Sequence, residues 1–205
     1  MFAPQQKKIS RLDGFLAKIH QLSENNRDKD SEKPVLVAID GRCASGKTSL
    51  CASLQRQFGW QVVHMDNFYL RPEQRTPERY AAPGGNVDYE RVFSEVLHPL
   101  EKGRRAVYRP LDCATLRLSE QEIPVEPSGI VLVEGAYACH PTLWDCYALR
   151  AFMTVSPETQ RQRIARRNGE EKLRVFLERW IPLEEMYISA YQLEHRCDYR
   201  LETDE

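Results

Sequence analysis

The segment 41–48 has the residue types and spacing of a phosphate-binding loop. It reads Gly-Arg-Cys-Ala-Ser-Gly-Lys-Thr, which fits the pattern G-x-x-x-x-G-K-[ST], and it follows directly on the apolar run 35–39. A buried strand that leads into such a loop brings backbone N–H groups around an anion, and the following helix directs its positive dipole end at the same point. We therefore expect this segment to bind a nucleoside triphosphate.

The side chains of this loop have distinct expected roles. Gly41 and Gly46 would let the backbone turn tightly and approach the phosphates. Lys47 would bridge the β- and γ-phosphates and assist catalysis, and the Thr48 hydroxyl would ligate Mg²⁺, a hard ion that prefers oxygen ligands. ATP and Mg²⁺ are thus the expected cofactors. The residues expected to contact ATP are Gly41, Arg42, Cys43, Ala44, Ser45, Gly46, Lys47, Thr48 and Ser49.

Two acidic residues come directly after predicted strands. Asp66 follows the strand expected at 61–65, and Glu134 follows the apolar run 130–133. Because ligands of parallel sheets bind beyond the carboxyl ends of the strands, both carboxylates should lie beside the bound triphosphate. One would accept a proton from an attacking hydroxyl and the other would orient Mg²⁺. The alternatives are that Asp66 caps a turn and that Glu134 pairs with a basic side chain.

Strands that alternate with helices predict the fold class. Helical spacing separates most of the predicted strands, and the strands are continuously apolar, which is typical of a parallel sheet covered on both faces. We expect an α/β fold, the P-loop NTPase three-layer sandwich with a mostly five-stranded parallel sheet and a small helical lid. The predicted strands are 35–39, 61–65, 130–133, 149–155 and 198–202, and the longer predicted helices include 89–100 and 182–195.

The segment 1–33 differs in character from the rest of the chain. Apolar residues recur at helical spacing from Ile9 to Leu22, which predicts an amphipathic helix. The run 23–33 is polar throughout and ends at Pro34, which predicts an exposed linker. We therefore divide the chain into this N-terminal helix with its linker and a P-loop domain at 34–205.

Composition narrows the class of protein. The 205 residues are 41% hydrophobic, enough for one substantial core, and 29 basic residues nearly balance 30 acidic ones. This balance argues against nucleic acid as the main partner. No apolar stretch has the length of a membrane span, so we expect a soluble, cytoplasmic protein that has no membrane partner. The six cysteines lack metal-ligand spacing and are expected to be reduced thiols, and the sequence leaves both a monomer and a homo-oligomer open.

Four segments in order resemble the uridine kinase-like P-loop kinases, a group similar to phosphoribulokinase and pantothenate kinase. They are the phosphate loop, Asp66-Asn67-Phe68-Tyr69, Asn86-Val87-Asp88 and Val133-Glu134-Gly135, and the resemblance covers most of residues 35–203. The loop is common to many ATPases, whereas the D-x-F-Y segment is much more specific.

The resemblance implies roles for individual residues. Asp66 would deprotonate the hydroxyl that attacks the γ-phosphate, which leaves Glu134 to hold Mg²⁺ with Thr48. Tyr69 would line the acceptor pocket, and Asp88 would bind hydroxyl groups of the acceptor. As alternatives, Tyr69 could belong to the core and Asp88 could be the N-cap of the next helix.

One segment departs from the family. Nucleoside-phosphorylating members carry a proline-tyrosine-aspartate segment followed by a histidine that reads the base. Here the tyrosine is replaced by Leu111, and no histidine follows. Recognition of uracil or cytosine therefore does not follow from the resemblance, and another nucleoside or a smaller alcohol is open as the acceptor.

An arginine-rich segment provides the last functional candidate. Arg163 and Arg167 would share one helix face, which suits a lid near 158–180 that closes over the triphosphate and excludes water. A solvated basic face or a contact with RNA is the alternative.

Two functions are consistent with these residues. The first is an ATP-dependent, uridine kinase-like enzyme that transfers the γ-phosphate to a primary hydroxyl of a nucleoside-like acceptor. The second is a P-loop ATPase or nucleotide-dependent regulatory protein that has no small-molecule acceptor.

Overall fold

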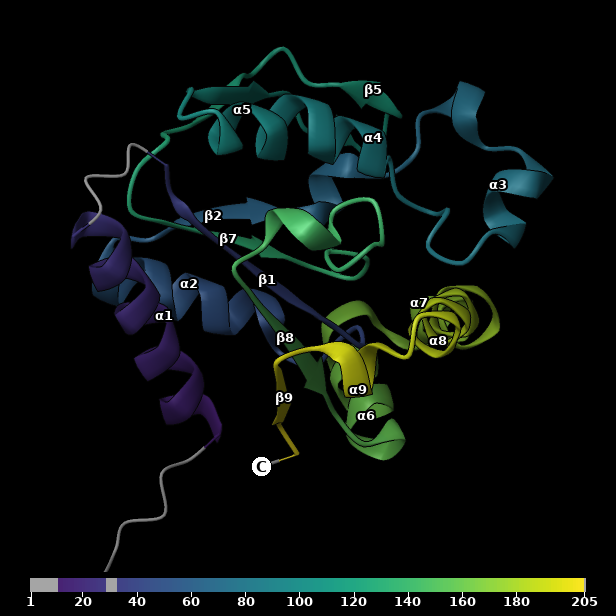
Figure 1. Ribbon diagram of the computed structural model, residues 1–205. Coiled ribbons are helices and arrows are strands. Elements are labelled where there is room, and N and C mark those ends of the chain that lie inside the picture. The colour runs from purple at the N-terminus through teal and green to yellow at the C-terminus, as the bar shows by residue number, and fades with distance from the viewer. Residues whose placement is uncertain (1–10, 29–32, 205) are drawn as a thin grey trace, which may run out of the picture.

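A five-stranded parallel sheet forms the centre of the protein. The computed structural model describes residues 11–28 and 33–204, and its main sheet has the strand order β2-β7-β1-β8-β9 (Figure 1). Every neighbouring pair in this sheet is parallel, which confirms the predicted α/β sandwich. The strands are β1 (Val35–Gly41), β2 (Gln61–His64), β7 (Ile130–Glu134), β8 (Leu149–Thr154) and β9 (Tyr199–Glu202).

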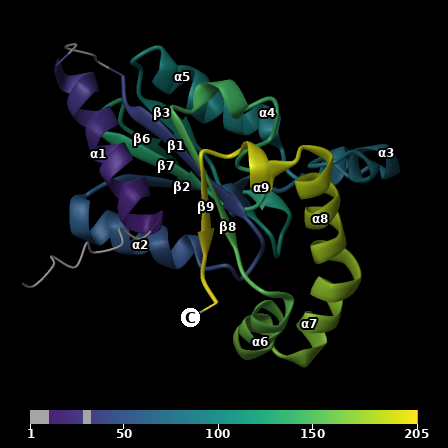
Figure 2. The same cartoon turned by 60° about the horizontal axis from the view of Figure 1, so that its bottom comes forward.

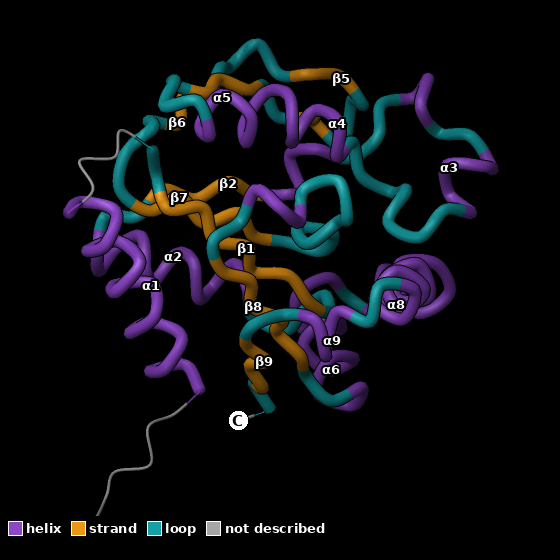
Figure 3. Tube along the Cα trace, viewed as in Figure 1, coloured by secondary structure: helices purple, strands orange, loops and turns teal. Residues whose placement is uncertain are grey.

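Helices cover both faces of the sheet because the central strand is apolar on both. Val37 and Ile39 belong to a core that α1 (Arg11–Asp28) and α2 (Lys47–Phe58) cover on one face. Leu36 points the other way and belongs to the second core. Figure 3 shows the strands gathered between α1 and α2 on one face and the helices of the other face. Burial on both sides explains why β1 is a continuous apolar run and does not alternate.

The second face is covered by the helical run predicted at 89–100. It consists of α4 (Tyr89–Arg91), the π-helical η3 (Val92–Leu97) and α5 (His98–Glu101). Pro99 lies at the start of α5, and the wider π turn before it accommodates a residue that donates no backbone N–H. The same arrangement recurs in η5 (Phe176–Trp180), which precedes Pro182.

A helical arm follows β8 and returns to the sheet at β9 (Figure 2). Its first helix begins at Pro157, because the Ser156 side chain accepts the N–H of Thr159 as an N-cap. The arm ends beside the phosphate loop. Its helices are α6 (Pro157–Asn168), α7 (Glu170–Val175), η5, α8 (Ile181–Ala190) and α9 (Leu193–Arg196).

Two short antiparallel pairs were not predicted. β3 (Ala106–Tyr108) pairs with β6 (Ile123–Val125), and β4 (Leu111–Asp112) pairs with β5 (Arg117–Leu118). Strands of two or three residues carry too little periodicity to be detected in a sequence. The remaining short helices are η1 (Met65–Phe68), η2 (Pro72–Gln74), α3 (Pro77–Ala81) and η4 (Trp144–Cys146).

The N-terminal helix is longer than predicted and packs on the main body. Phe15 and Ile19 are fully buried in the core that includes β1. The helix continues to Asp28, so the linker expected at 23–33 does not begin at residue 23, and positions 29–32 lie outside the described residues. Ser23 is itself buried, which shows that this helical turn still contacts the fold.

The described residues bear on the expectations about membrane spans and about the cysteines. No helix in residues 11–28 or 33–204 is long and apolar enough to cross a membrane. All six cysteines lie within these residues and are free thiols.

Candidate active site

The phosphate loop lies at the carboxyl end of β1, between the ends of β7 and β8. Gly41 has φ 134°, and a Cβ added there would lie 1.9 Å from the backbone oxygen of Met153. Gly46 has φ 96° and faces open space, where the nearest atom to an added Cβ is the Met153 Cε at 4.0 Å. Glycine is therefore required at Gly41 by the adjacent strand, and at Gly46 by a left-handed turn that leaves the approach open.

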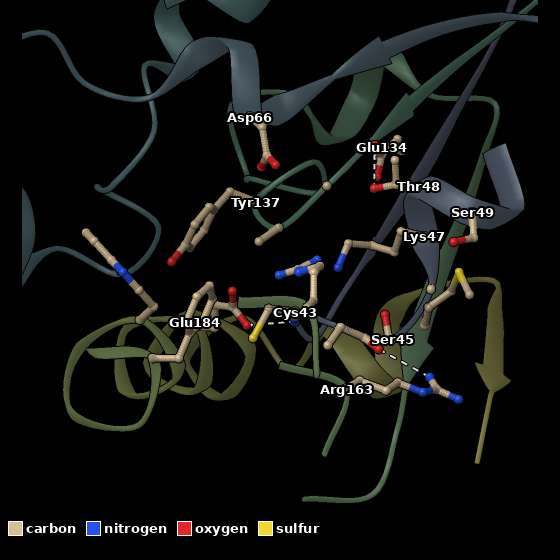
Figure 4. Close-up of a pocket in the computed structure, with 18 of the residues that line it drawn as sticks. Cys43, Ser45, Lys47, Thr48, Ser49, Asp66, Glu134, Tyr137, Arg163 and Glu184 are labelled. Atoms are coloured by element: carbon tan, nitrogen blue, oxygen red, sulfur yellow. Dashed lines mark hydrogen bonds between the residues drawn. The ribbon is translucent and has the colours of Figure 1, made fainter. Parts of the chain in front are cut away.

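Lys47 is held at the centre of this loop. The residue is only 7% exposed, and its Nζ donates to the carbonyl oxygens of Gly41 at 2.7 Å and Arg42 at 2.9 Å. These contacts place the ammonium beside the N-terminus of α2, within the cavity drawn in Figure 4. A fixed cation and a helix N-terminus at one point form an arrangement that binds a polyphosphate.

Thr48, Glu134 and His64 form one hydrogen-bonded group. Thr48 Oγ1 donates to Glu134 Oε1 at 3.1 Å, and His64 Nδ1 lies 2.6 Å from the same oxygen. The contact with the buried Glu134 raises the pKa of His64. His64 was not predicted as a site residue, because its link to Glu134 depends on the parallel register of β2 and β7, which places these two residues opposite each other.

Asp66 and Tyr69 lie together on the other side of the cavity. The Tyr69 hydroxyl donates to Asp66 Oδ1 at 3.0 Å, and both residues line the cavity. Burial raises the pKa of Tyr69, and the Asp66 carboxylate raises it further, so the phenol remains protonated and can donate. Phe68 between them is fully buried in the core. The D-x-F-Y segment thus directs two polar groups into the cavity and one ring away from it.

The first half of the phosphate loop is fixed to the helical arm that follows β8. The Arg42 guanidinium pairs with Glu185 and with Glu194, in each case at 2.6 Å. The Arg42 side chain therefore points away from the predicted ATP site and does not line the cavity. The backbone N–H of Cys43 donates to Glu184 Oε2 at 2.9 Å. The loop and the arm are thus mechanically linked through two consecutive loop residues.

Cys43 itself lines the cavity but is not an activated thiol. Its Sγ lies 3.3 Å from the Gln160 side-chain amide, and burial raises its pKa well above the ordinary value. A thiol in that state is a poor nucleophile at neutral pH. Ala44, Ser45 and Ser49, the other predicted ATP contacts, line the same cavity.

Asp88 caps a helix and does not line the cavity. It is 1% exposed, its Oδ1 accepts the Arg91 N–H at 3.2 Å, and its Oδ2 lies 3.6 Å from the Arg71 guanidinium. The N-cap, which the sequence analysis held as the alternative, is therefore observed. Its contact with an acceptor stays a prediction.

The segment that departs from the nucleoside kinases forms an apolar wall. Leu111 is buried in β4, whereas Cys113 and Leu116 at the hairpin turn line the cavity. Asp112 is occupied within the turn, where its carboxylate accepts the N–H of Ala114 at 2.8 Å. Among the described residues 111–118, the side chains that reach the cavity therefore include no phenol or imidazole.

The two predicted lid arginines both line the cavity but differ in how firmly they are held. Arg163 donates to Ala44 O at 3.2 Å and to the Thr203 hydroxyl at 3.1 Å, so it already touches the phosphate loop. Arg167 is exposed, and its Nε donates to the side chain of the adjacent Asn168. Arg166, which was not predicted, also lines the cavity.

One cavity of about 1370 Å³ joins these groups. It extends from the phosphate loop and Arg163 to Asp66 and the hairpin turn, and it exceeds the roughly 300–1,000 Å³ of an ordinary single-ligand pocket. Room for two ligands is what a transfer between two substrates requires. Lining residues that the sequence analysis did not assign to the site include Arg75, Tyr80, Asn86, Tyr137, Phe176, Trp180 and Glu184.

A buried carboxylate, Asp40, lies behind the cavity wall. Asp40 immediately precedes the loop and accepts hydrogen bonds from the Tyr137 N–H at 3.2 Å and the Tyr187 hydroxyl at 2.7 Å. Burial raises the pKa of Asp40, although these hydrogen bonds oppose the shift. Tyr137 is a non-glycine residue with φ 74°, a strained conformation that the contact with Asp40 helps to fix.

The residues at the loop fit a nucleotide and a magnesium ion. Thr48 and Glu134 present adjacent oxygen atoms, which are the donors that Mg²⁺ prefers. In residues 11–28 and 33–204 no group of three or more histidine, cysteine, aspartate or glutamate side chains could form a complete metal cage. A site with few protein ligands suits Mg²⁺, which keeps several waters and takes phosphate oxygens as further ligands.

Comparison with known proteins identifies kinase relatives. No family model matches the chain. Uridine kinase from Bacillus cytotoxicus is 27% identical over 153 residues, which cover 69% of this chain and 70% of that protein. The subunit tad2 of tRNA-specific adenosine deaminase from Schizosaccharomyces pombe is 28% identical over 141 residues, which cover 65% of this chain. A solved structure of a possible uridine kinase from Bacillus stearothermophilus has a TM-score of 0.62 at 18% identity and covers 92% of this chain and 99% of that chain.

These comparisons agree with the motifs. The matched region spans about a third of the deaminase subunit, 33%, and a larger share, 70%, of the uridine kinase. The structural similarity supports the fold. The sequence similarity extends over most of the chain and shows that it resembles the uridine kinase-like P-loop kinases.

Proposed function

We propose that this chain, which resembles the uridine kinase-like P-loop kinases, is an ATP-dependent small-molecule kinase that phosphorylates a primary hydroxyl. The observation that carries the proposal is that Lys47 and Asp66 line one cavity large enough for a nucleotide and an acceptor. Figure 4 shows Asp66 entering this cavity from the side opposite the phosphate loop and the arm. A pure ATPase needs a position for water, but it does not need a second binding space of this size.

The transfer step follows from this arrangement. The oxygen of the acceptor hydroxyl forms a bond to the γ-phosphorus, the bond from that phosphorus to the β-bridging oxygen breaks, and ADP leaves. Asp66 takes the hydroxyl proton, and Tyr69 holds the Asp66 carboxylate in place through its 3.0 Å hydrogen bond. Lys47 and the loop N–H groups stabilise the phosphate charge that moves toward ADP.

Thr48 and Glu134 would hold Mg²⁺. The ion would supply charge neutralisation at the phosphates when bound. Glu134 accepts the Thr48 hydroxyl and lies against His64 Nδ1, and these contacts keep the carboxylate in position beside the loop.

The segment near 158–180 would act as a lid. Arg167 is exposed at the cavity and can approach the phosphates, whereas Arg163 already anchors α6 to the loop at Ala44. Closure would exclude water, which suppresses hydrolysis of ATP in the absence of an acceptor.

An ADP-coupled screen over nucleosides, pantothenate-like alcohols and sugar phosphates tests the proposal. We expect ADP release that rises with the concentration of at least one acceptor and saturates. Turnover with water alone that no member of the panel changes would overturn the kinase and favour a P-loop ATPase or regulatory protein.

A further inference from the structure

Glu184 lies between the part of the cavity expected to hold ATP and the part expected to hold the acceptor. It is only 7% exposed, and one of its oxygens, Oε2, accepts the Cys43 N–H of the phosphate loop at 2.9 Å. Figure 4 shows the carboxylate rising from the helical arm into the same space that Asp66 enters from the opposite side. Burial raises the pKa of Glu184, whereas the charge of Lys47 and the Cys43 N–H oppose this shift and favour the carboxylate. Tyr69 and Tyr137 lie within its electrostatic reach on the acceptor side. A buried carboxylate with one oxygen directed into a cavity is suited to accept a hydrogen bond from a ligand.

Tyr137 supplies the complementary group. Its hydroxyl oxygen accepts a hydrogen bond from Asn86 Nδ2 at 3.3 Å, so the phenol proton can be donated to a ligand. Burial raises the pKa of Tyr137, and the Glu184 charge raises it further, which keeps this proton in place. A hydroxyl can donate to a carboxylate and accept from a phenol at the same time, so an acceptor hydroxyl fits this pair of side chains.

Two positions that correspond to acceptor-binding residues of the family do not line the cavity. Asp88 caps α4 and does not line the cavity, and Leu111 is buried in β4. The hairpin turn contributes the apolar Cys113 and Leu116. Glu184, Tyr137 and Asn86 are polar residues of the cavity lining that can take over recognition of the acceptor.

We propose that Glu184 and Tyr137 bind a second hydroxyl of the acceptor, one that is not phosphorylated, and so select polyhydroxy acceptors over simple alcohols. The inference rests on the proposed kinase function and adds two specificity residues to it. The buried polar groups would be left unpaired by an acceptor that lacks this hydroxyl, which is how a hydrogen-bonding site rejects such analogues.

The test combines one substitution with one change in the acceptor. Glu184→Gln keeps an oxygen for the Cys43 N–H but can present an amide donor to the cavity, so the link between arm and loop is preserved. The probes are uridine, adenosine, pantothenate and ribulose 5-phosphate, and the best of them is assayed beside analogues in which each remaining hydroxyl is replaced by hydrogen. Glu120→Gln, at an exposed position outside both the lid segment and the cavity lining, is the matched control.

We expect one deoxy analogue to lose about 10- to 100-fold in kcat/KM with the wild-type protein, the scale of a hydrogen bond to a charged group. Glu184→Gln should cause a similar loss with the parent acceptor and little further loss with that analogue. Tyr137→Phe should give a smaller loss of the same pattern. The KM for ATP should stay within about twofold in each variant, and Glu120→Gln should match the wild type.

Two results would contradict the inference and are distinguishable from each other. If Glu184→Gln raises the KM for ATP, or lowers activity equally with the parent and every analogue, Glu184 only fastens the arm to the loop. If the wild-type protein binds ATP but phosphorylates no probe, the proposed kinase function itself fails, and this inference fails with it.

Discussion

Thr48 and Glu134 lie 86 residues apart in the sequence and are joined by a 3.1 Å hydrogen bond at the ends of α2 and β7. The bond brings together the two oxygen ligands that were predicted separately for Mg²⁺. One comes from the phosphate loop and the other from the end of a strand. Because both belong to elements that meet at the carboxyl edge of the sheet, their proximity follows from the fold.

Glu134→Gln should weaken the use of Mg²⁺. The substitution replaces the negatively charged carboxylate beside Thr48 by a neutral amide. The Mg²⁺ concentration for half-maximal ADP release should therefore rise about tenfold or more. A Mg²⁺ titration at saturating ATP measures this. Glu126→Gln removes an exposed carboxylate that pairs with Arg105 and should leave the titration unchanged. An unaltered titration in Glu134→Gln would exclude the carboxylate from the metal site.

Tyr69→Phe should lower kcat by about 3- to 10-fold, because it removes one neutral donor from Asp66. Steady-state kinetics with the acceptor found in the screen check this. Tyr199→Phe is the control, since the Tyr199 hydroxyl bonds to the Gly14 carbonyl outside the cavity lining. A Tyr69→Phe variant with unchanged kcat would show that Asp66 does not depend on this contact.

Asp88→Ala should destabilise the protein by about 1 kcal/mol through loss of the helix cap. Urea unfolding measures the change, and Asp88→Ser, which retains a capping oxygen, should lose less. The KM for the acceptor separates the two roles of Asp88, since a change of less than about twofold is expected from loss of the cap alone. A tenfold rise in that KM without loss of stability would instead support the acceptor contact that the family resemblance implies.

His140 should make stability depend on pH in the acid range. Burial lowers its pKa from 6.5 to about 4, and its Nδ1 accepts the Thr142 N–H at 3.3 Å, a bond that protonation would break. Between these values the unfolded chain binds a proton that the folded chain does not. The stability from this group is therefore complete above about pH 6.5 and is lost as pH falls toward 4, by up to about 3 kcal/mol.

Denaturant unfolding at several pH values measures this contribution. His140→Phe keeps a ring that can stack on Tyr89, from which the His140 ring is 3.8 Å away, and removes the titrating group. Its stability should vary less between pH 6.5 and 4 than that of the wild type. Equal slopes in the two proteins would rule out His140 as the source.

The fold was predictable because its signals are local. β1 and β7 are short runs that are almost wholly apolar, and two helices have local cap signals at Gly59 and Ser156. The end of α1 was misplaced because polar residues such as Glu24 can continue a helix that is already anchored by Phe15 and Ile19.

The donor half of the site was predictable and much of the acceptor half was not. The phosphate loop is one continuous segment, so its pattern is complete in the sequence. Glu184 lies 141 residues from Cys43, which it contacts, and no motif surrounds it. His64 depends on the register between β2 and β7. Such pairings arise from the order of strands and the return of the arm, which residue spacing does not encode.

The most direct test of the kinase follows the γ-phosphate. The protein is incubated with ATP, Mg²⁺ and the acceptor from the screen, and the phosphate on the acceptor is measured against free inorganic phosphate. We expect nearly all of it on the acceptor, and Asp66→Asn should lower kcat about 100-fold or more at nearly unchanged ATP affinity, whereas Asp145→Asn at an exposed site should not. Release of the γ-phosphate to water, at a rate that neither the acceptor nor Asp66→Asn alters, would contradict the account.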